Sequence, residues 1–395
     1  MSMFDDWRKR VEDDLVGAQQ ALQQKQQLLE RLKQVHQQAL DLIDSGSTVP
    51  VDIPWEFAHG LSILEGVVDG RHLPSTEAEL PTRVMDDGTL LGCRKWELLD
   101  PQWGEALVEW FEHLLNRAPW AAKPNHIAML DNASFNIAGD WGTGEYIAAK
   151  VAKAMSAMPA DYTVHLGDVY YAGSSPDELR DFASWPAGTH GQFTLNSNHE
   201  MYNGAFGYFQ ELGLRFPLQQ GTSYFSLYNQ NWLIIGLDTA YWSEKFNLYM
   251  DGALGDAQTA WLKEVTAGWQ GKILLLSHHQ GYAMDGSTKT QLYQEVAAAL
   301  GRDPDYWYWG HLHNVICYQP QGKLLARCVG HGAIPYGPAK ALDGKPQVAW
   351  AETRSADDSQ YPERVLNGFV RLELNGDALT ETFYDENGYQ RWPGH

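Results

Sequence analysis

Residues 162–171 read YTVHLGDVYY, a short apolar run that ends at Gly167 and Asp168. Residues 133–142, ASFNIAGDWG, show the same order, with a glycine and Asp140 directly after the apolar residues. Short apolar runs bounded by glycine and polar residues are typical of strands that are buried on both faces. The two stretches therefore predict strands of an α/β fold, each followed by a carboxylate.

The same texture continues along the chain from about residue 126. Further apolar runs lie at 193–195, 232–237 and 273–276, and helix-like stretches lie at 145–158 and 256–265. Strands that alternate with helices indicate an α/β domain, which we place at residues 126–395. Residues 368–391 alternate between apolar and polar side chains and contain two Asn-Gly turns, so closing β-hairpins are expected there.

Polar side chains follow five successive predicted strands. The stretches are GDWG at 139–142, GDVYY at 167–171, SNHE at 197–200, SHH at 277–279 and GHLH at 310–313. Function gathers at the carboxyl ends of strands in an open α/β fold, and core packing does not produce such a series. Carboxylate, amide and imidazole groups suit first-row metal ions, and phosphoester hydrolysis benefits from two ions about 4 Å apart. The series therefore predicts a two-metal centre.

In this order the five blocks resemble the calcineurin-like metallophosphoesterases. The blocks are D-x-G, G-D-x-x-Y, N-H-E, x-x-H and G-H-x-H, and their details are similar to the purple acid phosphatase branch. The resemblance covers roughly residues 126–340. It implies an α/β fold, the metallophosphoesterase four-layer αββα sandwich, and a dinuclear centre at which metal-bound hydroxide attacks the phosphorus atom of a phosphate ester.

The resemblance also implies a role for each matching position. The implied metal ligands are Asp140, Asp168 as the bridge between the ions, Tyr171 as a phenolate, Asn198, His278, His311 and His313. His199 is implied as a group that binds no metal and acts as general acid toward the leaving group. In contrast, we expect Tyr170 to pack in the core and His165 to be a strand histidine bonded to the backbone.

One position in the first block selects the branch. Gly142 stands where most of the superfamily has a ligand histidine, and Tyr171 would replace that ligand. Because a phenolate favours Fe(III), the implied cofactors are two metal ions, Fe with Fe, Zn or Mn. Such a centre keeps a net positive charge and attracts a phosphate group. Ser197 departs from the family pattern, which usually has glycine at that place.

The composition limits the classes of partner. The chain has 395 residues and a formal net charge of −21, which excludes non-specific binding to nucleic acid or to an anionic membrane, since both need a basic face. Three cysteines are too few for a disulfide framework. The N-terminus lacks an apolar signal segment and no run of about 18 apolar residues exists, so a cytoplasmic protein is expected.

The segment before the α/β domain divides into two parts. Residues 1–46 carry apolar side chains at alternating spacings of four and three, from Val11 to Ile43, which predicts a long amphipathic helix. Its apolar stripe requires either a second copy, giving a coiled-coil homo-oligomer, or a partner within the chain; Lys25 and His36 interrupt the stripe. Residues 47–125 are predicted to be a helical accessory region.

These features together predict a metal-dependent phosphoesterase that acts on a small phosphate ester. Monoesters are favoured by the resemblance in the first two blocks. The alternatives are a phosphodiesterase or nucleotide hydrolase on the same centre, and a non-catalytic scaffold of the same fold that assembles through its N-terminal helix. Tyr241, Trp242 and Tyr336 are either surface-loop aromatics or side chains that stack on an aromatic leaving group.

Overall fold

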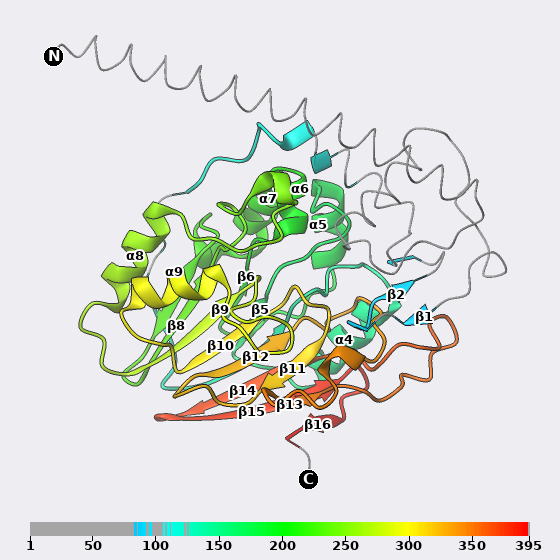
Figure 1. Ribbon diagram of the computed structural model, residues 1–395. Helices are drawn as coiled ribbons and strands as arrows, with labels where there is room; N and C mark the ends of the chain where they lie inside the picture. Colours follow the sequence, from blue (N-terminus) through cyan, green and yellow to red (C-terminus); the bar gives the residue numbers. More distant parts are fainter. Residues whose placement is uncertain are drawn as a thin grey trace.

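Figure 1 shows the computed structural model of the chain. It describes residues 126–393 and, before them, residues 83–84, 86–91, 95–96, 106, 109–110, 112–121 and 124. The helix predicted at residues 1–46, with its coiled-coil or brace role, lies outside the described residues. None of the helices in the described part of the chain has the length and apolar character that crossing a bilayer requires.

Two β-sheets carry the fold of the described residues (Figure 1). The first sheet has the strand order β16 (Gln390–Trp392), β15 (Ala378–Asp385), β14 (Gly368–Asn375), β4 (Asn132–Ala138), β5 (Tyr162–His165) and β6 (Gly191–Thr194). The second has the order β13 (Val348–Ala351), β11 (Val315–Tyr318), β12 (Leu325–Val329), β10 (Tyr306–Trp309), β9 (Lys272–Ser277), β8 (Trp232–Leu237), β7 (Phe225–Tyr228) and β3 (His126–Ala128). The hairpins β14–β15 and β15–β16 are antiparallel, which confirms the prediction for residues 368–391.

The two sheets face each other across an apolar core. Alternate residues of the strands point into it, because successive side chains of a strand lie on opposite faces. The core contains Phe135, Ile137, Val164 and Phe193 from the first sheet, and Ile234, Leu274, Leu276 and Tyr308 from the second. These side chains are fully buried, so both sheets have an apolar inner face.

Helices cover the outer faces of both sheets. Apolar side chains of α4 (Tyr146–Ala157), α5 (Ser175–Phe182) and α7 (Phe206–Arg215) pack in one outer cluster. Those of α8 (Asp256–Thr266) and α9 (Gln291–Leu300) pack on the outward-facing residues of β8 and β9. The order helix, sheet, sheet, helix confirms the predicted four-layer αββα sandwich.

Parallel pairing sets where the loops lie. Strands β4, β5 and β6 are mutually parallel in the first sheet, and β8, β9, β10 and β12 are parallel in the second. Parallel strands end at the same edge of a sheet, so the loops that follow them converge. The predicted functional blocks are these loops.

The described part of residues 47–125 is not helical throughout. Strands β1 (Arg83–Val84) and β2 (Leu90–Leu91) pair in a small antiparallel hairpin. Gly88 has a φ of 94°, and a Cβ there would lie 2.6 Å from the carbonyl oxygen of Gly337. The N–H of Gly337 donates to the carbonyl of Gly88 at 2.7 Å, so glycine allows this hairpin to dock on the α/β domain.

Candidate metal centre

The loops after the strands bring the predicted metal ligands to one place. Asp140 follows β4, Asp168 follows β5, His278 follows β9, His311 follows β10, and Asn198 is the first residue of α6 (Asn198–Tyr202). Asp140, Asp168, His311 and His313 have positive φ angles of 56°, 74°, 69° and 51°. A side-chain-bearing residue in this left-handed region costs about 1–3 kcal/mol, and such residues cluster at functional sites.

Asp140, Asp168 and His313 form a first cluster of metal-binding side chains. One donor atom of each lies within 4.8 Å of the others, and Nε2 of His313 is 3.3 Å from Oδ1 of Asp140. Oδ2 of Asp140 accepts a hydrogen bond from the N–H of His311 at 2.9 Å, whereas Oδ1 is buried with no hydrogen-bond partner among the described residues. Burial and the neighbouring Asp168 raise the pKa of Asp140 well above its usual range. A cation would satisfy this oxygen and offset the repulsion.

His278, His311 and Asn198 form a second cluster beside the first. Nε2 of His278 lies 2.9 Å from Oδ1 of Asn198 and 3.1 Å from Nδ1 of His311. Nδ1 of His278 donates to the carbonyl of Leu166 at 2.9 Å, which leaves Nε2 as the unprotonated nitrogen of the neutral ring. Burial lowers the pKa of both histidines, so both are neutral and able to bind a metal ion.

Asp168 lies between the two clusters. Its Oδ1 is 3.2 Å from Nε2 of His278, and its Oδ2 is 3.8 Å from Nε2 of His313. Burial opposes its ionisation, but the surrounding histidines outweigh burial and hold its pKa well below the usual range. Asp168 is therefore an ionised carboxylate with one oxygen toward each cluster, which is the arrangement that a bridging ligand needs.

His279 also lies within reach of His278 and His311. Both nitrogens of its ring are already engaged, because Nδ1 lies 2.8 Å from Oγ1 of Thr239 and Nε2 donates to the carbonyl of Tyr249 at 2.8 Å. His278 is the member of this adjacent pair that the family resemblance implies as the metal ligand. The hydrogen bonds favour the same choice and give His279 a structural role.

The phenol group beside the first cluster differs from the sequence-based expectation. The hydroxyl of Tyr170, expected to pack in the core, lies 2.8 Å from Oδ2 of Asp168 and 2.8 Å from Nε2 of His313. The ring of Tyr171 stacks on Trp96 at 4.3 Å instead. The reason is local: Val169 pairs with Gly142 in a short parallel bridge, and alternation then puts Tyr170 on the same side as Asp168.

His199 stands at the edge of the first cluster. Its Nδ1 donates to the carbonyl of Tyr171 at 2.7 Å, and its Nε2 faces Oδ2 of Asp168 at 3.8 Å. Burial lowers its pKa, while the negative charge of Asp168 acts in the opposite direction. The hydrogen bond to the backbone fixes the ring, so Nε2 is the nitrogen that faces the cluster.

Ser197 and Glu200 form hydrogen bonds with Asp168. The hydroxyl of Ser197 contacts both Oδ1 of Asp168 and Oε2 of Glu200, and the N–H of Asp168 donates to Oε2 of Glu200 at 3.3 Å. Burial and the charge of Asp168 raise the pKa of Glu200 well above its usual range. Ser197, which departs from the family pattern, therefore supplies a hydroxyl that links these two buried acidic groups.

A cavity of about 310 Å³ opens onto the two clusters. Asp168, Asn198, His199, His311 and His313 line its floor. Its walls include residues that the sequence analysis did not select, namely Asp87, Thr89, Trp96 and Gln280, together with Tyr336, which it did flag. The hydroxyl of Tyr336 contacts that of Thr89 at 2.5 Å, so the accessory segment and the α/β domain form this wall jointly. No motif marks these wall residues, because only the fold brings them to the cavity.

The donor set fits metal ions. The two adjacent clusters contain the carboxyl groups of Asp140 and Asp168, neutral imidazoles and the amide oxygen of Asn198. Oδ1 of Asp140 is buried without a hydrogen-bond partner among the described residues. Residues 133–315 match the family described as calcineurin-like phosphoesterase, so this part of the chain is a calcineurin-like phosphoesterase domain.

Two solved structures are similar to the chain at low sequence identity. GAP50, described as the anchor in the inner membrane complex of Plasmodium, is 13% identical with a TM-score of 0.46, over 66% of this chain and 88% of that one. TT1561 of Thermus thermophilus is 10% identical with a TM-score of 0.38, over 53% of this chain and 96% of that one. No curated protein sequence matches the chain at a significant level.

Proposed function

We propose that the protein is a dinuclear metal-dependent phosphoesterase that hydrolyses a small phosphate monoester. The observation that carries this proposal is the position of Asp168, whose two carboxylate oxygens face the two clusters separately, at 3.2 Å from His278 and 3.8 Å from His313. A single bridging carboxylate between two sets of donors is the arrangement that two-metal phosphoester hydrolysis uses.

Each cluster would hold one metal ion. Asp140, Asp168, His313 and the phenol of Tyr170 would hold the first, and Asp168, Asn198, His278 and His311 the second. Bound ions would supply Lewis-acid neutralisation of the phosphoryl oxygens and activation of water. The phenol donor favours iron at the first position, so we propose Fe with Fe, Zn or Mn as the metal pair.

His199 is the residue we propose to transfer a proton to the leaving group. It lines the cavity, and its Nδ1–H is committed to the carbonyl of Tyr171, so Nε2 is the atom that can hold the transferred proton. Asp168 favours the protonated ring and burial disfavours it. A phosphate group in the cavity would add negative charge and thereby favour the proton on Nε2.

An assay with an aryl phosphate monoester and the corresponding diester tests the proposal. The metal-loaded protein is expected to hydrolyse the monoester with the higher kcat/KM, and His199→Gln is expected to lower kcat by roughly 10²- to 10⁴-fold with little loss of bound metal. The exposed His190→Gln variant is the matched control. Preference for the diester would select the phosphodiesterase alternative, and no turnover with two bound metal ions would favour the scaffold alternative.

A further inference from the structure

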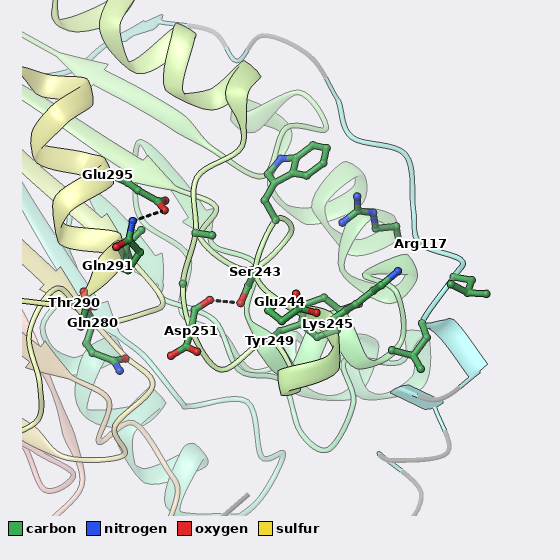
Figure 2. A pocket seen from close by; sticks show the side chains of 16 residues that line it. Arg117, Ser243, Glu244, Lys245, Tyr249, Asp251, Gln280, Thr290, Gln291 and Glu295 are labelled. Carbon is green, nitrogen blue, oxygen red and sulfur yellow. Dashed lines mark hydrogen bonds between the residues drawn. The ribbon is translucent and has the colours of Figure 1, made fainter. Parts of the chain in front are cut away.

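A second and larger cavity adjoins the cavity at the metal centre. Its volume is about 950 Å³, and Asp251 and Gln280 line both cavities. Figure 2 shows Asp251 between the start of α9 on one side and Arg117 on the other, with Gln280 below the start of α9. The cavities are therefore neighbours that share a wall at Asp251 and Gln280.

One loop, residues 242–253, forms a wall of both cavities. Its residues Asn247, Met250 and Asp251 line the metal-centre cavity, and Trp242 and Lys245 line the larger one. The carbonyl of Tyr249 accepts the hydrogen bond from His279, the neighbour of the metal-binding His278. The shape of the larger cavity is thus tied to the edge of the sheet that carries the metal centre.

Arg117 gives the far end of this cavity a positive charge. Its guanidinium group lies 4.2 Å from the ring centre of Tyr241 and 4.7 Å from that of Trp242, and Nη1 donates to the carbonyl of Tyr241. Within the part of the chain that the structure describes, no carboxylate forms an ion pair with Arg117. Burial and the charge of Arg117 lower the pKa of Lys245, whereas the charge of Glu244 acts in the opposite direction.

The lining also contains three acidic residues: Glu244, which lies beside Lys245, and Asp251 and Glu295, which accept hydrogen bonds from donors of their own. Glu295 accepts hydrogen bonds from the N–H of Leu254 at 2.9 Å and from Gln291 at 3.3 Å, and Asp251 accepts one from Asn247 at 2.7 Å. Figure 2 shows Glu295 and Gln291 across the cavity from Arg117. The positive charge of Arg117 therefore lines the cavity without a carboxylate partner among the described residues.

Trp242 supplies an apolar wall next to Arg117. The side chain is 40% exposed, and its indole lies over Gly255, where a Cβ would be 2.3 Å from Nε1. The neighbouring Tyr241 is buried, so of this aromatic pair only Trp242 offers its ring to the cavity. The oxygen Oε1 of Gln280, at the junction of the two cavities, is buried without a hydrogen-bond partner among the described residues.

We propose that the larger cavity is the subsite for the leaving group of an extended phosphate ester, and that Arg117 binds a second anionic group, a carboxylate or phosphate, on that leaving group. This inference rests on the proposed function, because it places the ester phosphate at the metal centre. The body of the leaving group passes Asp251 and Gln280 and packs against Trp242. The subsite thus selects phosphate esters with two separated negative charges over esters with one.

A matched series of substrates tests the subsite. Phosphate monoesters of 4-hydroxyphenyl alkanoic acids of increasing chain length are compared with the corresponding amides, which have nearly the same leaving-group reactivity and no second charge. At low ionic strength, the metal-loaded protein is expected to show a kcat/KM roughly tenfold higher for the acid than for the amide at the chain length that reaches Arg117. Arg117→Gln is expected to bring this ratio to about one, and the exposed Arg302→Gln control to leave it unchanged.

The ratio is an internal control, because a general loss of activity or folding affects the acid and the amide equally. Two results would contradict the proposed subsite. One is an acid-to-amide ratio of kcat/KM near one at all chain lengths in the unmodified protein, and the other is a raised ratio that persists in Arg117→Gln. Calorimetry of the free acids and amides tests whether Arg117 binds the second anionic group, and it does so even if the protein shows no turnover. Tighter binding of the acid that disappears in Arg117→Gln supports it, and equal binding contradicts it, whereas absent turnover counts only against the proposed function.

Discussion

The hydroxyl of Tyr170 lies 2.8 Å from Oδ2 of Asp168, and it also lies 2.8 Å from Nε2 of His313. Asp168 and His313 lie in loops of different sheets, since Asp168 follows β5 of the first sheet and His313 lies between β10 and β11 of the second. Within the first cluster of side chains, Tyr170 therefore connects Asp168 from one sheet with His313 from the other. Its neighbour Tyr171 stacks on Trp96 of the accessory segment.

Substituting the two tyrosines separately distinguishes their roles. With iron in the first cluster, Tyr170→Phe is expected to abolish the visible phenolate-to-Fe(III) absorption band, because it removes the phenol oxygen that lies beside Asp168 and His313. Tyr171→Phe is the matched control and is expected to keep the band. Absorption spectra of both iron-loaded variants under oxidising conditions provide the measurement; a band that survives Tyr170→Phe and disappears in Tyr171→Phe would assign the ligand to Tyr171.

The adjacent histidines provide a second matched pair. His278→Ala is expected to reduce bound metal from two ions to one or fewer, because Nε2 of His278 is the unprotonated nitrogen beside Asn198 and Asp168. His279→Ala is expected to keep both ions and to lower the free energy of unfolding by about 1–3 kcal/mol, since Thr239 and the carbonyl of Tyr249 lose their buried partner. Metal analysis after gel filtration and denaturant unfolding measure both; loss of metal only in His279→Ala would reverse the two roles.

His165 makes the stability of the fold sensitive to acid. Burial lowers its pKa to about 3 from 6.5, so the folded protein keeps the ring neutral where the unfolded chain binds a proton. Stability is therefore lost as the pH falls from 6.5 toward 3. For this one group the loss is about 2 kcal/mol at pH 5.

The variant His165→Phe is expected to remove this part of the pH dependence. The ring packs among Trp141, Phe182 and Trp185, so an aromatic replacement suits the site. Unfolding of the metal-free protein is compared at pH 7 and pH 5, with the exposed His190→Gln variant as the control. An equal loss of stability in His165→Phe and the unmodified protein would contradict the prediction.

Arg364 holds a buried charge network at the edge of the first sheet. Its Nε donates to Asp358 at 2.7 Å, and its two terminal nitrogens donate to Glu386 at 2.6 and 2.7 Å. Burial opposes the ionisation of Asp358, but hydrogen bonds from Tyr146 and Arg364 outweigh it and bring its pKa to about 2. Arg364 is fully buried, and Glu386 nearly so.

Arg364→Met is expected to lower the free energy of unfolding by about 3–5 kcal/mol, because it removes the guanidinium group from Asp358 and from the buried Glu386, which keeps only the Lys150 amine at 3.1 Å. The exposed pair of Arg302 and Asp305 provides the control, and Arg302→Met is expected to cost less than about 1 kcal/mol. Denaturant unfolding curves give both values. A loss for Arg364→Met no larger than that of the control would mean that the network contributes little to stability.

Local pattern was sufficient to predict much of the fold. Short apolar runs ending in glycine and a polar residue indicated the strands β4, β5 and β9, and the Asn-Gly turns indicated the hairpins of β14, β15 and β16. The prediction of a helical accessory region did not include the hairpin of β1 and β2. That hairpin has strands of only two residues, and it is held by contacts with Gly337 and Tyr336, which lie far away in the sequence.

At the candidate site, too, some residues were predictable from the sequence and others depend on contacts between distant segments. The resemblance of the five blocks to a known family selected Asp140, Asp168, Asn198, His278, His311 and His313, and the structure brings them together. Tyr170 and Tyr171 could not be separated by their position in the sequence, since both follow the same strand. Gln280, Trp96 and Arg117 carry no motif, because their place beside a cavity depends on loops from distant segments.

The sequence by itself determined which carboxylate, amide and imidazole groups meet at the candidate metal centre, because the carboxyl ends of parallel strands converge whatever the loops do. The tertiary structure alone decided which tyrosine faces Asp168, which nitrogen of each histidine is available, and which cavity adjoins the centre. Those features depend on backbone direction after the strand and on hydrogen bonds from other elements, such as the carbonyls that orient His278 and His279. Such contacts join residues far apart in the chain, and no spacing along the sequence encodes them.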